Sequence, residues 1–86
     1  MERRNPPRTR VLKGGKLIFN QHASVIDCTV RNLSNDGACL QLVTTLSVPE
    51  EFELSFDSFR TVRHCRVRWR TAEKLGVAFY LRTLLQ

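Results

Sequence analysis

Long apolar runs are absent from this chain of 86 residues. A membrane-spanning helix needs about 20 consecutive apolar residues, so no membrane insertion is expected. The basic N-terminus is not followed by an apolar stretch of the kind that signal peptides contain. Together these absences predict a cytoplasmic protein.

Cysteine is scarce, and its spacing argues against two kinds of site. The three cysteines, Cys28, Cys39 and Cys65, form no Cys-x-x-Cys pair, as a zinc site or a redox motif would require. Each lies within an apolar pattern. We therefore expect three buried free thiols in a reducing compartment, and no metal site.

Catalytic motifs are missing as well. The chain has no Gly-rich phosphate loop, no Gly-x-Ser-x-Gly and no His-Glu-x-x-His. His22 and His64 have no evident cysteine or serine partner, and the surroundings of Cys28 favour a core thiol over a nucleophile. The sequence therefore predicts a protein that is not an enzyme, with no catalytic residue and no resident cofactor.

Acidic residues are outnumbered by basic ones. Fourteen Lys and Arg stand against eight Asp and Glu, a net charge of +6. This sign favours an anionic partner, which can be a nucleic acid, a nucleotide or an acidic membrane surface. The basic residues concentrate in residues 1–16 and 60–70, which predicts two basic patches.

Apolar and polar residues alternate along most of the chain, with the period of half-buried β-strands. Six such segments lie at or near residues 11–19, 26–31, 38–43, 52–56, 65–70 and 75–81. Short strands at regular spacing predict an all-β fold, a six-stranded antiparallel β-barrel over residues 11–86. Residues 81–86 could add at most a very short helix.

Two local features refine this prediction. Gly14-Gly15 interrupts the first strand, where we expect a bulge or a bend. Asn35-Asp36-Gly37 is a turn signal, since Asn and Gly tolerate positive φ.

Trp69 alternates with Cys65 and Val67, which predicts a place in the core. The arginines between them form either a solvated face or a docking stripe.

Residues 1–10 form a polar, basic segment that contains Pro6-Pro7. Proline disfavours helix and limits the backbone entropy that is lost on ordering. Arg4 and Arg8 flank the prolines, and arginine suits phosphate because its planar fork donates two parallel hydrogen bonds. The segment is therefore either a flexible ligand-binding arm or a plain basic tail.

Asn32, Ser34 and Gly37 lie where one predicted strand ends and the next begins. Asn32 offers a donor and an acceptor, and the Ser34 hydroxyl can act as either. Gly37 permits a backbone geometry, or a close ligand approach, that a side chain would block. Taken alone, the segment is an ordinary β-turn.

The two motifs together are more specific. Arg4-x-x-x-Arg8, followed 24 residues after Arg8 by the Asn-x-Ser-x-x-Gly pattern of residues 32–37, resembles the PilZ domain family. Residues 67–69 and 75–79 resemble the last two strands of that family. The likeness covers nearly the whole chain, and its specificity comes from the order and spacing of the motifs.

The resemblance implies a barrel that binds cyclic di-GMP, a bacterial second messenger. The arginine pair would then contact phosphates and guanines, and the turn would lie against a guanine. An arginine at the position of Arg3 often accompanies a stacked ligand dimer in such proteins. The ligand-binding residues that the resemblance implies are Arg3, Arg4, Arg8, Asn32, Ser34 and Gly37. Members commonly have a longer C-terminal helix than residues 81–86 could form.

The expected function is thus a receptor whose arm becomes ordered on cyclic di-GMP and which signals through an unidentified effector protein. Two alternatives remain open at this point. One is a small basic barrel that binds nucleic acid, which predicts several exposed aromatic residues on one sheet face. The other is a PilZ-like adaptor that binds protein but no nucleotide, against which the intact arginine pair argues.

Overall fold

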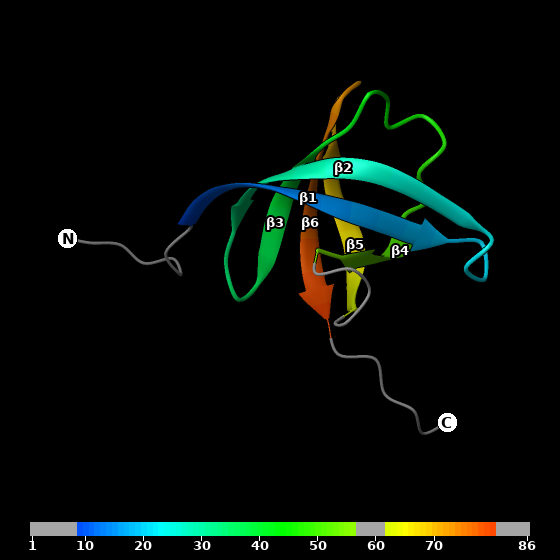
Figure 1. Cartoon of the computed structure of the whole chain (residues 1–86), viewed down its shortest axis with the longest axis horizontal. Helices are drawn as coiled ribbons and strands as arrows, with labels where there is room; N and C mark the ends of the chain where they lie inside the picture. Colours follow the sequence, from blue (N-terminus) through cyan, green and yellow to red (C-terminus); the bar gives the residue numbers. More distant parts are fainter. Residues whose placement is uncertain (1–8, 57–61, 81–86) are drawn as a thin grey trace.

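The computed structural model describes residues 9–56 and 62–80, and all regular elements in them are β-strands (Figure 1). The strands are β1 (Thr9–Phe19), β2 (Ser24–Leu33), β3 (Gly37–Gln41), β4 (Glu51–Ser55), β5 (Arg63–Arg70) and β6 (Lys74–Tyr80). They close into a barrel in the order β1-β2-β3-β6-β5-β4, with every pair antiparallel. The predicted fold class is confirmed.

The core follows from the alternation of the strands. Successive side chains of a strand point to opposite faces, so every second residue enters the barrel. Leu17, Leu40, Leu54 and Leu75 are completely buried there and come from four different strands. Burial of a side chain of this size stabilises the fold by about 1.5–3 kcal/mol. The interior is filled by side chains, which leaves the outer surface as the place for a ligand.

Strand β1 differs from the prediction at two places. Its first residues, Thr9 and Arg10, pair with β2, although they belong to the segment expected as an arm. The register shift in β1 lies between Arg10 and Lys13, just before the two glycines and not at them. Gly14 and Gly15 continue the regular ladder. The N-terminal segment therefore enters the barrel already paired with β2.

Backbone with positive φ occurs in the β1–β2 loop and not at the predicted turn. Asn20, Gln21 and His22 have φ values of 60°, 57° and 71°. Side chains other than glycine adopt this region at a cost of about 1–2 kcal/mol per residue. A hydrogen bond from Ala23 N to Asn20 O, 3.0 Å long, closes the loop. No described glycine has positive φ, so the expected geometry at Asn35-Asp36-Gly37 is not observed.

Trp69 is the clearest error of the sequence-based interpretation. A bulge lies in β5 between Val67 and Trp69, opposite β6. One extra residue reverses the faces of all side chains that follow it. Trp69 consequently points outward and is 47% exposed, where it lies against Gly76.

No helix in the described part of the chain is long and apolar enough to cross a membrane. The short helix considered for residues 81–86 falls outside the described residues.

Candidate functional site

The turn between β2 and β3 is built around the hydroxyl of Ser34. Its Oγ accepts hydrogen bonds from the backbone N–H groups of Asp36 and Gly37, both 3.2 Å long. Ser34 N donates to Gly37 O at 2.9 Å, and Phe79 N donates to Asp36 O at 2.8 Å. The turn is therefore fixed within itself and to β6. The predicted turn is present, and its serine has a structural role in it.

Gly37 is required by strand packing. A Cβ atom built on this residue would lie 2.1 Å from the backbone oxygen of Val77. No side chain fits at such a distance, so β3 and β6 approach each other closely only because residue 37 is glycine. This approach is that of a neighbouring strand, and the close approach of a ligand to Gly37 stays a prediction.

The N-terminal segment meets this turn directly. Thr9 pairs with Leu33, the residue before Ser34, and Arg10 pairs with Asn32. Because strands pair at about 4.8 Å, the chain that precedes Thr9 starts beside the Asn-x-Ser-x-x-Gly turn. Figure 1 shows the start of β1 beside the end of β2, on the side of the barrel that carries the β2–β3 turn.

The structure brings Asn32, Ser34 and Gly37 together at the junction of β2 and β3. Arg3, Arg4 and Arg8 lie outside the described residues. Asn32 is half-buried, and its Cα partner in β3 is Cys39. The described half of the predicted site is thus a compact group on one side of the barrel.

Trp69 extends this group around the barrel. Asn32 pairs with Cys39, Cys39 with Gly76, and Gly76 with Trp69, so these four residues form one row across β2, β3, β6 and β5. Ala38 and Leu40, the neighbours of Cys39, point into the core, so the row lies on the outer surface. We call it the outer row. It ends in an exposed indole, which the alternation pattern had assigned to the core.

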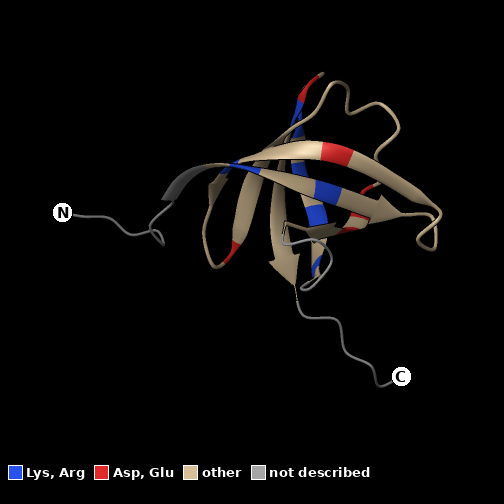
Figure 2. Ribbon diagram, viewed as in Figure 1, with Lys and Arg blue, Asp and Glu red and all other residues tan. Residues whose placement is uncertain are grey.

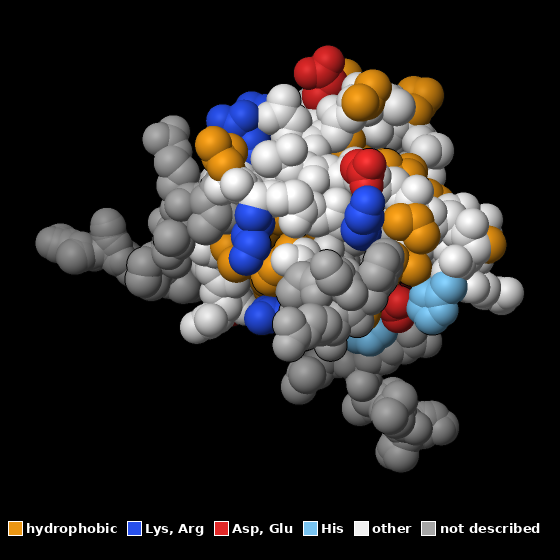
Figure 3. Space-filling view, in the orientation of Figure 1, with side chains coloured by type: hydrophobic (Ala, Val, Ile, Leu, Met, Phe, Trp, Pro, Cys, Tyr) orange, Lys and Arg blue, Asp and Glu red, His pale blue; other side chains and the backbone are white. Residues whose placement is uncertain are grey.

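Charges of both signs lie near the β2–β3 turn: Lys13 pairs with Val30, Arg31 precedes Asn32, and Asp36 lies in the turn itself. Figure 3 shows blue side chains on the half of this face nearest the N-terminus, whereas the histidines lie toward the β1–β2 loop. Acidic positions are mostly paired with basic ones, as Lys16 with Asp27 on neighbouring strands (Figure 2). The charge around the turn is therefore mixed, and an anion there would be attracted by the cations of β1 and β2.

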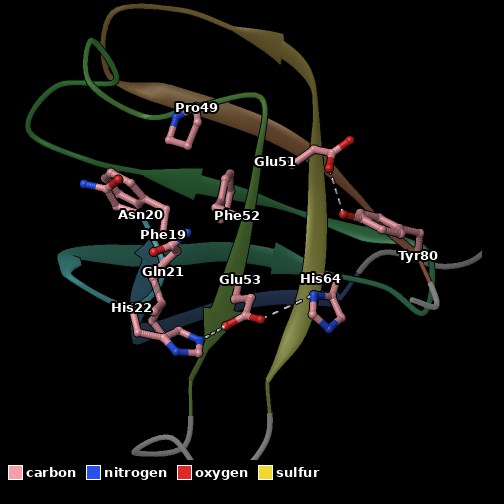
Figure 4. A pocket seen from close by; sticks show the side chains of 11 residues that line it. Phe19, Asn20, Gln21, His22, Pro49, Glu51, Phe52, Glu53, His64 and Tyr80 are labelled. Atoms are coloured by element: carbon pink, nitrogen blue, oxygen red, sulfur yellow. Dashed lines mark hydrogen bonds and ion pairs between the residues drawn. The ribbon is translucent and has the colours of Figure 1, made fainter. Parts of the chain in front are cut away.

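A larger hollow of about 640 Å³ lies on a different part of the barrel, at the β1–β2 loop and β4 (Figure 4). The Glu53 carboxylate lies between two imidazoles, 2.8 Å from Nε2 of His22 and 3.6 Å from Nδ1 of His64. On the other side, the Tyr80 hydroxyl donates to Glu51 at 3.3 Å. This cluster was not predicted, because its members come from four separate segments of the chain.

This hollow does not suit an anionic ligand. Its polar lining includes the carboxylates of Glu51 and Glu53, and a carboxylate repels a phosphate. Among the residues that the structure describes, no three His, Cys, Asp or Glu side chains are grouped as a metal site. The surface at the β2–β3 turn remains the better candidate for a nucleotide.

The thiols divide into two kinds. Cys28 and Cys65 are buried, and burial raises the pKa of each to about 12, which makes them poor nucleophiles. Cys39, in the outer row, is only partly buried. The prediction of free core thiols is therefore confirmed for two of the three cysteines and is wrong for Cys39.

Comparison with known proteins identifies the family of the chain. The PilZ domain model matches residues 2–85, nearly the entire chain. No curated protein matches the chain. A match of this extent, together with the closed six-stranded barrel, shows that the chain belongs to the PilZ domain family.

Proposed function

We propose that this protein is a receptor for cyclic di-GMP, which it holds between the arginines of its N-terminal segment and the β2–β3 turn. PilZ domains in general bind this nucleotide and act as receptors, not as enzymes. For this chain, the observation that carries the proposal is the pairing of Thr9 with Leu33 and of Arg10 with Asn32. Arg8 directly precedes Thr9 in the sequence, so this pairing supports a site between Arg8 and the turn.

The proposed contacts follow from chemistry. Arg4 and Arg8 donate paired hydrogen bonds to phosphates or to the O6 and N7 atoms of guanine. Asn32 and the backbone around Ser34 contact a guanine edge. Arg3 would reach a second nucleotide, if two molecules bind as a stacked dimer.

Trp69 adds a surface for stacking. Its half-exposed indole lies at the other end of the outer row from Asn32. A base that rests on this row can stack on the ring, and such stacking contributes about 1–3 kcal/mol per base. The single tryptophan of the chain then also reports binding through its fluorescence.

Signal transfer is proposed to proceed by association. Ligand phosphates draw residues 1–8 onto the barrel, and the changed surface is recognised by an effector protein. The nucleic-acid alternative needs several exposed aromatic residues on one face. In the described part only Trp69 is a strongly exposed aromatic side chain, so no observation favours that alternative.

Calorimetry with cyclic di-GMP tests the proposal. The wild-type protein is expected to bind, and Arg8→Ala is expected to bind at least about tenfold more weakly, since a charge-assisted hydrogen bond contributes roughly 1.5–3 kcal/mol. Lys16→Gln is the matched control, because it removes the same charge from an exposed ion pair with Asp27. Absence of heat with the wild type would overturn the proposal. Salt-dependent binding of generic oligonucleotides in its place would favour the alternative.

A further inference from the structure

We propose that Arg31 is a further phosphate-binding residue of this site, on the side of Asn32 away from the β2–β3 turn. The inference rests on the proposed function. It starts from the position of Arg31 in the sheet. Val30 pairs with Leu40 and Asn32 with Cys39, so Arg31 is an extra residue opposite β3. The register of β1 shifts at the same level, between Arg10 and Lys13.

Arg31 lies on the outer face of β2, as its alternation with buried Val30 requires. The bulge turns Asn32 to the same face, so that Arg31 and Asn32 lie side by side there, and bulges are frequent next to functional sites. The guanidinium of Arg31 reaches the outer surface of β3, where Nη1 donates to Oε1 of Gln41 at 2.6 Å. Gln41 lies two residues after Cys39, so this cation lies about 7 Å along β3 from the outer row.

The present partner of Arg31 is neutral. No carboxylate within residues 9–56 or 62–80 forms an ion pair with it, and its side chain is half-buried. A half-buried cation loses hydration that an amide oxygen replaces only in part. A phosphate would supply both the missing charge and two acceptors for the guanidinium fork.

The position of Arg31 suits a ligand that carries two phosphates. The chain that precedes Thr9 begins beside Leu33, whereas Arg31 lies on the other side of Asn32. A cyclic dinucleotide carries two phosphates in one ring. The arm can therefore bind one phosphate while Arg31 binds the other, with a guanine between them at Asn32.

Calorimetry with cyclic di-GMP on Arg31→Gln tests the inference, with Lys16→Gln as the charge-matched control. Lys16 lies opposite Asp27, about 13 Å along β2 from Arg31. We expect Arg31→Gln to weaken binding about tenfold, because the charge-assisted contact between the guanidinium and a phosphate is lost. Lys16→Gln should stay within about twofold of wild type.

A second variant separates ligand binding from a structural role. Gln41→Ala removes the bond that holds Arg31 in the free protein but leaves the guanidinium in place. It should bind cyclic di-GMP as tightly as wild type, or more tightly. If the Arg31–Gln41 bond serves only to support the sheet, Gln41→Ala and Arg31→Gln will lower the melting temperature and the affinity together, which overturns the inference.

These experiments separate a failure of the role of Arg31 from a failure of the proposed receptor function. Wild-type binding with equal affinities for Arg31→Gln and Lys16→Gln overturns the role of Arg31 and leaves the receptor function intact. No wild-type binding overturns both. If Arg31→Gln does not fold, Arg31→Lys replaces it. This variant keeps the charge but loses the fork, so we expect an intermediate loss, and unchanged affinity refutes the role.

Discussion

Replacing Gly76 by alanine is expected to displace the indole of Trp69. A Cβ atom on residue 76 would lie 2.1 Å from Nε1 and 2.2 Å from Cε2 of that ring. Both atoms belong to a side chain that can rotate away, so the strands stay paired while the ring swings into solvent. The variant therefore tests the position of Trp69 without dismantling the barrel.

The size of the effect follows from the covered area. Trp69 is 47% exposed, so roughly half of a ring that buries about 150–250 Å² when enclosed would lose its cover. About 100 Å² at 25 cal/mol per Å² amounts to about 2.5 kcal/mol. Alanine is favoured over glycine in a strand by about 0.5–1 kcal/mol. We expect a net fall of about 1.5–2 kcal/mol in the free energy of unfolding.

Urea denaturation followed by circular dichroism measures this change, and the emission of the single tryptophan reports the ring. Emission should move to longer wavelength in the folded Gly76→Ala protein. Gly14→Ala is the matched control, because a Cβ there meets no atom within 4 Å and should stabilise the barrel. In a Trp69→Ala background, Gly76→Ala should no longer destabilise. Unchanged emission and unchanged stability in the single variant would refute the proposed packing.

Other variants and conditions test the turn and the core. Ser34→Ala removes the acceptor of two backbone N–H groups and should lower the free energy of unfolding by about 1–2 kcal/mol in urea, with Ser34→Thr close to wild type. Gly37→Ala should destabilise more strongly and reduce soluble yield, because its Cβ meets backbone; wild-type stability would contradict this. Ellman's reagent should modify one thiol quickly, that of Cys39, and all three only after denaturation. Because burial raises the pKa of Cys28 and Cys65 from 9.0 to about 12, the unfolded chain releases these protons first, so stability falls as pH rises from 9 toward 12. Cys28→Ala should make that fall shallower, and an identical slope would argue against the assignment.

The barrel could be predicted because half-buried strands carry a simple period. Leu40, Leu54 and Leu75 lie in the core as alternation requires. The same rule failed at Trp69, since the bulge after Val67 depends on pairing with β6 and leaves no local trace. Alternation therefore predicts the correct face for side chains before a bulge and the opposite face for those after it.

The candidate site was predictable where its chemistry is local. The hydrogen bonds of Ser34 to Asp36 and Gly37 span two and three residues, so the turn was visible in the sequence. The contact of Gly37 with Val77 and the place of Trp69 depend on the pairing of β3, β6 and β5, which no local pattern records. Positive φ in the β1–β2 loop was not predicted either: Asn20 and His22 tolerate it, but the loop contains no glycine and Gln21 has no such preference.

The barrel closes through its shortest ladder in the described part. Strands β1 and β4 pair only at Lys16–Ser55, Leu17–Leu54 and Ile18–Glu53, whereas β1 and β2 pair along almost their full length. Local openings begin where the fewest hydrogen bonds must break. In native-state hydrogen exchange, the amides of this seam should therefore exchange before those shared by β5 and β6. We therefore expect the barrel to open into a sheet by separation of β1 from β4. The edge that this opening frees belongs to β1, the strand that follows the N-terminal arginines in the sequence.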